Sequence, residues 1–345
     1  MLSTTVRGRG YTSGGSSPGA AEAGPDYRER WSMRLGIRSV LIVAVAAWLL
    51  PAQDALAWGP AMHVGLAGTI LEHLSLLPAA VAGLLARHAI PYLYGNIAAD
   101  VVFAKRLSRV RQSCHHWSTG LRLLDSAADP PSRAFAQGYL SHLAADTVAH
   151  AKFVPRQIVL CDCSINFGHF YWELRADAMQ SDQTWSLVQR VLQHDHTRHH
   201  DALAGQITDT LLSFEMNRLL FDRMNALAVR RGFRRTVTTW SRYSRFALSD
   251  ELLAAYADEC LDRIRSVLTL GPRSLVLRED PNGTSALMQV RVRRREARRL
   301  RRGGRCVGRR MSEVAAGLAP APAGCFASGA GRTPEAGTNP LVELA

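Results

Sequence analysis

Apolar residues recur at helical spacing through most of the chain between residues 58 and 275. One stripe runs through Leu203, Ile207, Leu211 and Phe214, and another runs through Leu252, Tyr256, Cys260 and Ile264. We find no convincing run of alternating apolar and polar residues and no internal repeat. The pattern therefore predicts an all-α fold, a single-domain multi-helix bundle.

The individual helices can be outlined from the same pattern. Asp201 and Asp250 stand where helix N-caps are expected. We expect helices over residues 64–74, 76–89, 117–127, 132–150, 167–180, 201–229, 237–247 and 250–270.

The segment before residue 58 is typical of a secretion signal. Arg34 and Arg38 precede an unbroken apolar run over residues 40–50, and Ala55 and Ala57 supply the small residues that a signal peptidase requires. The run is shorter than the ~20 residues that span a bilayer. We therefore predict a signal peptide over residues 33–57 and a secreted or periplasmic mature protein; an uncleaved membrane anchor is the less favoured alternative. Residues 1–32 are interpreted as an upstream extension or a disordered leader.

Much of the net charge of +13 lies towards the ends of the chain. Residues 291–310 contain eleven arginines, and alanine, glycine and proline are frequent after residue 311. We expect residues 276–345 to form a basic, low-complexity, disordered tail. Such a tail is either solvated or in contact with anionic lipid or nucleic acid. The overall charge is thus weak evidence that the domain over residues 58–275 binds nucleic acid.

Candidate metal ligands gather in the middle of the chain. His142, Asp146 and His150 stand at positions i, i+4 and i+8, which span about 80° of one helix face. Their neighbours are mostly apolar, and polar side chains in such surroundings are costly unless something pairs with them. His169 and Glu173 repeat the i, i+4 spacing, and imidazole with carboxylate is a donor set that suits zinc.

Two further candidate ligands precede this helix in the sequence, and a third group would become a ligand only after signal-peptide cleavage. Asp100 closes the segment 95–100, and His115 lies just before Trp117. Cleavage after Ala57 would leave Trp58 with a free α-amino group, which can chelate a metal together with its own carbonyl, and His63 follows five residues later. Each element alone is a weak signal, but together they favour a metal site.

These residues and their spacing resemble the zinc-dependent phospholipase C family, α-helical bacterial enzymes that hold up to three clustered zinc ions. The resemblance implies that Asp146 bridges two ions and that Asp100 lies at this pair as the proposed general base. The implied metal ligands are Trp58, His63, Asp100, His115, His142, Asp146, His150, His169 and Glu173. Two departures are the short gap between Asp146 and His150, and the adjacency of His115 and His116, of which we prefer His115.

The resemblance also implies the activity. We expect an exported zinc-dependent phosphodiesterase that hydrolyses phospholipid through a metal-activated water. Because the substrate is a lipid, we also expect the enzyme to make peripheral contact with a membrane. One alternative is a single-strand nuclease of related fold, which would bind nucleic acid. Another is a non-catalytic metal-binding protein. Neither the lipid head group nor the oligomeric state can be predicted from the sequence.

Three other features remain open. The histidines of residues 194–200 are interpreted as a solvated loop rather than a further metal site. The arginines of residues 230–235 are interpreted as a solvated turn rather than a lipid or nucleic-acid patch. Cys161 and Cys163 could form a disulfide with Cys114 or bind metal.

Overall fold

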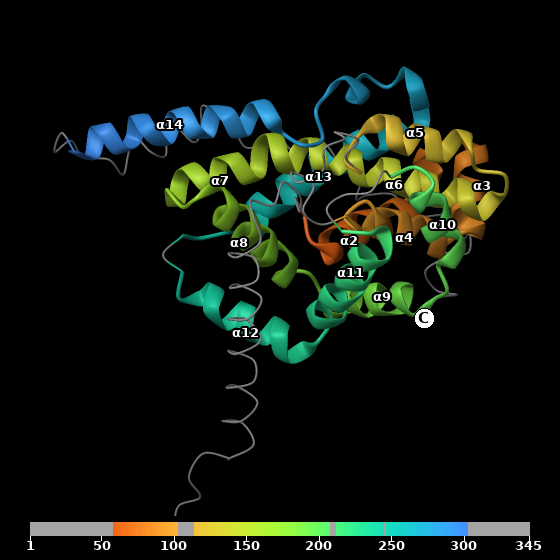
Figure 1. The fold of residues 1–345 in the computed structure, drawn as a ribbon, viewed down its shortest axis with the longest axis horizontal. Coiled ribbons are helices and arrows are strands. Elements are labelled where there is room, and N and C mark those ends of the chain that lie inside the picture. The colour runs from red at the N-terminus through yellow and green to blue at the C-terminus, as the bar shows by residue number, and fades with distance from the viewer. Residues whose placement is uncertain (1–57, 103–113, 208–211, 245, 303–345) are drawn as a thin grey trace, which may run out of the picture.

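The computed structural model describes residues 58–102, 114–207, 212–244 and 246–302, coloured in Figure 1. These ranges are largely helical and contain no β-strand, which confirms the all-α prediction. The helices are α2 Pro60–Glu72, α3 Ala79–Arg87, α4 Ala89–Ala98, α5 Trp117–Asp125, α6 Pro130–Val148, α7 Val154–Cys161, α8 Ile165–Ala178, α9 Asp182–Gln193, α10 Thr197–Ala204, α11 Phe214–Ala228, α12 Arg231–Arg242, α13 Asp250–Leu270 and α14 Thr284–Arg302. Short turns of other helix types are Leu74–Leu76, Ala149–Phe153, Gly271–Arg273 and Leu275–Arg278.

The helix boundaries differ from the sequence pattern mainly where capping decides them. Helix α13 has the predicted bounds, but Ser249 rather than Asp250 is its N-cap and accepts a hydrogen bond from the Leu252 N–H. The helix predicted over 201–229 is two helices, α10 and α11. Asp201 lies within α10, and α11 begins at Phe214, with the side chain of Ser213 as its N-cap. Helices α4, α7, α9 and α14 were not predicted.

Helix α6 lies at the centre of the fold, between α4, α5 and α13. Its contact with α4 is made backbone to backbone through two glycines. A Cβ on Gly138 would lie 2.0 Å from the Tyr92 carbonyl oxygen, and a Cβ on Gly95 would lie 2.1 Å from the Phe135 carbonyl oxygen. Only glycine permits this approach, which holds the end of α4 beside the polar face of α6.

The core beneath α6 is built largely from aromatic side chains. The ring of Trp58 stacks on Phe153 with centroids 4.5 Å apart, and Phe153 meets Tyr256 of α13 edge to face. All three side chains are fully buried. Together with Cys260 and Ile264, Tyr256 confirms the apolar stripe predicted for α13.

Part of the expected C-terminal tail is folded. Residues 276–302 form most of the turn Leu275–Arg278 and all of α14, which packs on α7 and on the turn Ala149–Phe153. The side chain of Val290 in α14 is fully buried, so this segment is not a disordered tail. The predicted extension 1–32, the signal peptide 33–57 and the remaining tail 303–345 lie outside the described residues. Among the described helices, none has both the length and the apolar character needed to cross a membrane.

Candidate metal centre

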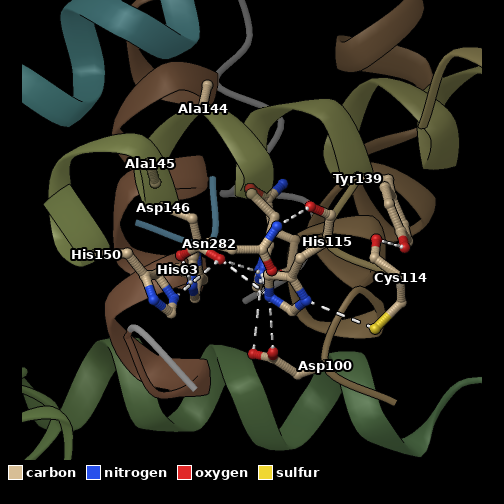
Figure 2. A network of polar contacts seen from close by, with 12 residues as sticks. His63, Asp100, Cys114, His115, Tyr139, Ala144, Ala145, Asp146, His150 and Asn282 are labelled. Atoms are coloured by element: carbon tan, nitrogen blue, oxygen red, sulfur yellow. Dashed lines mark hydrogen bonds and ion pairs between the residues drawn. The ribbon is translucent and has the colours of Figure 1, made fainter. Parts of the chain in front are cut away.

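Asp146 of α6 is the centre of a buried cluster of histidines (Figure 2). The Nε2 atom of His142, one turn earlier, lies 3.0 Å from Asp146 Oδ2, and that of His150, one turn later, lies 3.7 Å away. His150 lies in a π-helical turn, Ala149–Phe153, which follows α6 directly. The short spacing from Asp146 to His150 therefore still brings both side chains to one face. Such π-helical turns are frequent at functional sites.

Two neighbouring segments add to this face. From α2, His63 Nε2 lies 3.4 Å from Asp146 Oδ1, and the His63 ring stacks on His142. Just before α5, His115 Nε2 lies 3.0 Å from Asp146 Oδ2 and 3.1 Å from Asp100 Oδ1. The neighbouring His116 is exposed, so His115 is the histidine that joins the cluster.

The donor atoms form two sets that are compact enough to hold an ion. Within His63, Asp100 and His142, one donor atom from each residue lies within 4.8 Å of the others, and the same is true of His115, His142 and Asp146. All of these residues are buried. The two sets share His142, so they lie directly beside each other.

A third group lies next to them on α8. His169 Nε2 is 2.9 Å from Glu173 Oε1, and the His169 ring lies 4.8 Å from that of His150, centroid to centroid. Glu173 and His169 are both buried. The structure thus brings His150, His169 and Glu173 together beside the first two sets.

One supporting contact orients the ring of His142. Its Nδ1–H donates to the backbone carbonyl of Asn96, at 2.9 Å. In the neutral ring this bond leaves the lone pair on Nε2, which points at Asp146, and this is the tautomer that a metal ligand needs. The sequence pointed to the segment 95–100 but gave no sign that a carbonyl within it orients His142.

The electrostatics of the cluster favour a charged carboxylate at Asp146 and a neutral imidazole at His63. Burial alone would raise the pKa of Asp146, but His142, His115 and His63 hold it well below its usual value. Burial and the nearby His142 lower the pKa of His63. Neither carboxylate oxygen of Asp146 receives a hydrogen bond of good geometry, although four imidazoles surround it. Nitrogen lone pairs and carboxylate oxygens that converge in this way fit zinc.

Contacts with the turn Ala149–Phe153 and with α8 hold the segment that runs from Trp58 into α2. The ring is buried against Phe153, in the same turn as His150. Asp177 of α8 accepts hydrogen bonds from the backbone N–H groups of Ala61 and Met62 and so caps α2 from outside. Burial raises the pKa of Asp177 to about 7, although these two hydrogen bonds act to lower it. This contact, which the sequence did not reveal, fixes the segment that leads from Trp58 to His63.

A pocket of about 100 Å³ adjoins the cluster. His63, Asp100, Glu173 and Asp177 line its polar side. Its remaining wall is mostly apolar and comes from α8, α11 and α12, with Phe170, Leu174, Phe221, Met224, Phe233 and Val237 among its side chains. The cluster is therefore accessible to a ligand that has both a polar and an apolar part.

The segment after α13 also supports the cluster. The Asn282 side chain donates to the backbone carbonyl of His115 at 2.9 Å, and Figure 2 shows the two residues side by side. Gly283 is so close to His150 that a Cβ on it would lie 2.3 Å from the His150 carbonyl oxygen. Sequence reasoning missed both residues because it assigned them to the disordered tail.

Three other expectations differ from the structure. The arginines of residues 231–235 begin helix α12 and do not form a turn. His196 and His199 are buried, and the His196 ring stacks on Tyr94 at 3.5 Å, so this segment is not a solvated loop. Cys161 and Cys163 form a disulfide with each other. Cys114 is not part of it, and its Sγ lies 3.5 Å from His115 Nδ1.

Comparison with known proteins agrees with this geometry. Residues 62–233 match the family model described as zinc dependent phospholipase C. No curated protein and no solved structure matches the chain significantly. The matched region contains all of the clustered residues from His63 to Glu173, together with α12 up to Phe233. The chain belongs to the zinc-dependent phospholipase C family.

Proposed function

We propose that the protein is an exported zinc-dependent phosphodiesterase that hydrolyses phospholipids in the manner of a phospholipase C. The observation that carries the proposal is the convergence of His63, Asp100, His115, His142 and Asp146 at one end of a pocket whose other walls are apolar. Hydrolysis of a phosphodiester requires the cluster of metal-binding side chains, and the apolar walls of the pocket fit a lipid substrate. A purely structural or storage metal site would have no need of an adjoining pocket.

The residues divide naturally among up to three zinc ions. Asp146 would bridge two ions, one of them also bound by His115, His142 and Asp100, and the other by His63 and the freed amino group and carbonyl of Trp58. His150, His169 and Glu173 would hold a third ion. Zinc supplies a Lewis acid for the phosphate oxygens and brings the pKa of a bound water towards neutrality.

The chain's own residues would provide positioning and proton transfer. Asp100 lines the pocket and lies 3.1 Å from His115, so its carboxylate is placed to orient an attacking water and to accept its proton. Asn96 keeps His142 in the required tautomer. The apolar wall from α11 and α12 would receive the lipid part of the substrate and exclude bulk water.

The test is an assay of the mature protein, beginning at Trp58, on phosphatidylcholine and on denatured DNA. We expect diacylglycerol and a phosphorylated head group from the lipid, with zinc bound in stoichiometric amount. The variant Asp100→Asn should lose turnover and, because Asp100 is one of several ligands, should keep a larger share of its zinc than Asp146→Asn. Cleavage of the DNA alone would favour a nuclease, and tight zinc binding without any hydrolysis would favour a non-catalytic metal-binding protein.

A further inference from the structure

Two side chains that line the pocket beside the metal centre carry buried N–H groups that find no acceptor within the described part of the chain. One is Trp185 of α9, which is 4% exposed and whose indole N–H makes no hydrogen bond there. The other is Arg234 of α12, whose Nε–H is in the same position. Tryptophan and arginine side chains donate hydrogen bonds and accept none. Because a buried donor is costly when nothing accepts from it, two of them in one pocket indicate a ligand with acceptor oxygens.

The two donors belong to neighbouring side chains. The guanidinium carbon of Arg234 lies over the Trp185 ring, 5.2 Å from its centroid. Stacking on an aromatic face fixes the plane of a guanidinium group. Asp182 accepts a hydrogen bond from Nη1 of Arg234 at 2.8 Å, but the Asp182 side chain is 76% exposed. Such an exposed ion pair contributes little, and it occupies only one of the five N–H groups of the guanidinium.

Arg234 differs in position from the neighbouring arginines of α12. It is the only lysine or arginine among the described residues that line the pocket. Around the helix axis it lies about 60° from Val237, which also lines the pocket, whereas Arg235 lies about 160° from Val237. Arg231 and Arg235 are exposed and do not line the pocket. The pocket therefore contains one selected cation rather than the edge of a basic surface.

The same pocket reaches the metal centre through His63, Asp100 and Glu173. In the proposed function the zinc ions would neutralise the scissile phosphodiester, so that group does not require Arg234. The rest of the wall is mostly apolar. A positive charge in apolar surroundings is stable when an anion pairs with it, and a second anionic group on the substrate would supply that partner.

We propose that Arg234 and Trp185 form a subsite for a second anionic group, a carboxylate or a phosphate, in the head group of the substrate. The planar guanidinium matches two oxygens of such a group, and the indole N–H can donate to one of them. The substrate class is then a phospholipid with an acidic head group, of which the serine carboxylate is the simplest case. The inference rests on the proposed function, since it assigns the head group for that reaction.

Matched pairs of head groups test the proposal. Phosphatidylserine differs from phosphatidylethanolamine by one carboxylate, and phosphatidylinositol monophosphate differs from phosphatidylinositol by one phosphate. Each lipid should have short acyl chains and be assayed below its micelle-forming concentration, so that no charged lipid surface takes part. For at least one pair we expect kcat/KM of the zinc-loaded mature protein to be about tenfold or more higher for the acidic member, because hydrogen bonds to charged groups contribute about this factor.

Variants of the two donors should reduce this ratio of kcat/KM within a pair. Arg234→Gln should bring the ratio close to one, and Arg234→Lys should keep part of it because the charge remains while the planar fork is lost. Trp185→Phe keeps a ring but not the N–H, so the ratio should fall several-fold. Arg235→Gln and Trp240→Phe are the matched controls, because these exposed residues of α12 do not line the pocket. Each ratio is measured within one protein, so a general loss of folded enzyme cancels.

Equal rates for both members of each pair would overturn the proposal. A ratio that Arg234→Gln leaves unchanged, or one that the controls lower equally, would do so too.

A binding measurement keeps this result distinct from the proposed function. Calorimetry should show that the zinc-loaded protein binds glycerophosphoserine more tightly than glycerophosphoethanolamine, or the inositol monophosphate analogue more tightly than its counterpart. Arg234→Gln should remove the difference. Such a difference without hydrolysis of any phospholipid would refute the proposed function and leave the subsite standing. Hydrolysis of phospholipids without any preference for the acidic members would refute the subsite and leave the proposed function standing.

Discussion

Gly138 of α6 lies against Gly95 of α4 so closely that a Cβ on Gly138 would come within 3.0 Å of the Gly95 Cα atom. We expect Gly138→Ala to destabilise the metal-free protein by about 1–3 kcal/mol, the usual cost of overpacking a core. Zinc affinity should fall as well, because the same contact holds Asn96 beside His142. Urea unfolding and zinc titration would measure both effects.

Gly232→Ala is the matched control for this variant, because an added Cβ there meets no atom within 4 Å. It should be neutral or slightly stabilising, since alanine favours helix formation more than glycine does. If both variants unfold at the same urea concentration, the close contact of α4 with α6 does not limit stability.

Asp146→Asn should empty most of the metal site. Four imidazoles lie 3.0–3.7 Å from the carboxylate, and the amide cannot supply the negative charge that two ions would share. We expect lower zinc content and at least a ~100-fold loss of kcat/KM, because even partners outside the ligand shell cost ~10–100-fold. Zinc analysis and turnover would measure this, with the exposed Asp201→Asn as control. Full zinc content in Asp146→Asn would contradict the bridging role.

Processing before Trp58 should control metal loading. We expect Ala57→Phe to block signal-peptide cleavage and to leave the protein short of its full zinc complement, because an amide nitrogen does not coordinate as an amine does. N-terminal sequencing coupled to metal analysis measures both. Ala47→Phe serves as the control, because it makes the same substitution within the apolar run over residues 40–50 and should leave cleavage intact. Full zinc stoichiometry in the uncleaved variant would refute the role of the amino group.

His199 should make the protein sensitive to acid. Burial lowers the pKa of His199 to about 4, from about 6.5 in the unfolded chain. The unfolded state therefore binds the proton more readily, and stability falls as the pH is lowered from about 6.5 towards 4. His199→Phe, which can keep the stacking on Phe135, should lose less in Tm over this window. The exposed His194→Phe should behave like the unmodified protein, and identical pH profiles for all three would exclude His199 as the cause.

The folded part should extend beyond residue 275. A protein ending after Arg302 should keep its Tm and zinc content, whereas one ending after Leu275 should lose both. The shorter protein lacks the buried Leu287 and Val290, each worth about 1.5–3 kcal/mol, and also Asn282, which supports His115. Thermal unfolding of the two proteins would test the boundary. Equal stability of the two proteins would support the disordered tail over residues 276–345 that was expected from the sequence.

Much of the fold could be predicted because the helical spacing of apolar residues reports directly on burial, as the stripe of α13 illustrates. The residues of the cluster could be recognised because His142, Asp146 and His150 are polar on an apolar helix. What the sequence could not reveal depends on contacts between distant segments. Asp177 caps α2 from α8, Asn96 acts through a carbonyl that every residue has, and Asn282 lies in a segment whose arginines suggested disorder.

The contact of Asn282 with His115 has a consequence for the order of events during biosynthesis. Trp58 and His63 are made first, and Asn282 is made more than two hundred residues later. The donor set therefore gains its last support only when nearly the whole domain has been synthesised. Any ion captured earlier would meet a partial set of donors and exchange rapidly. Stable zinc uptake should thus mark the completion of folding, and retention of the metal should report on correctly assembled molecules.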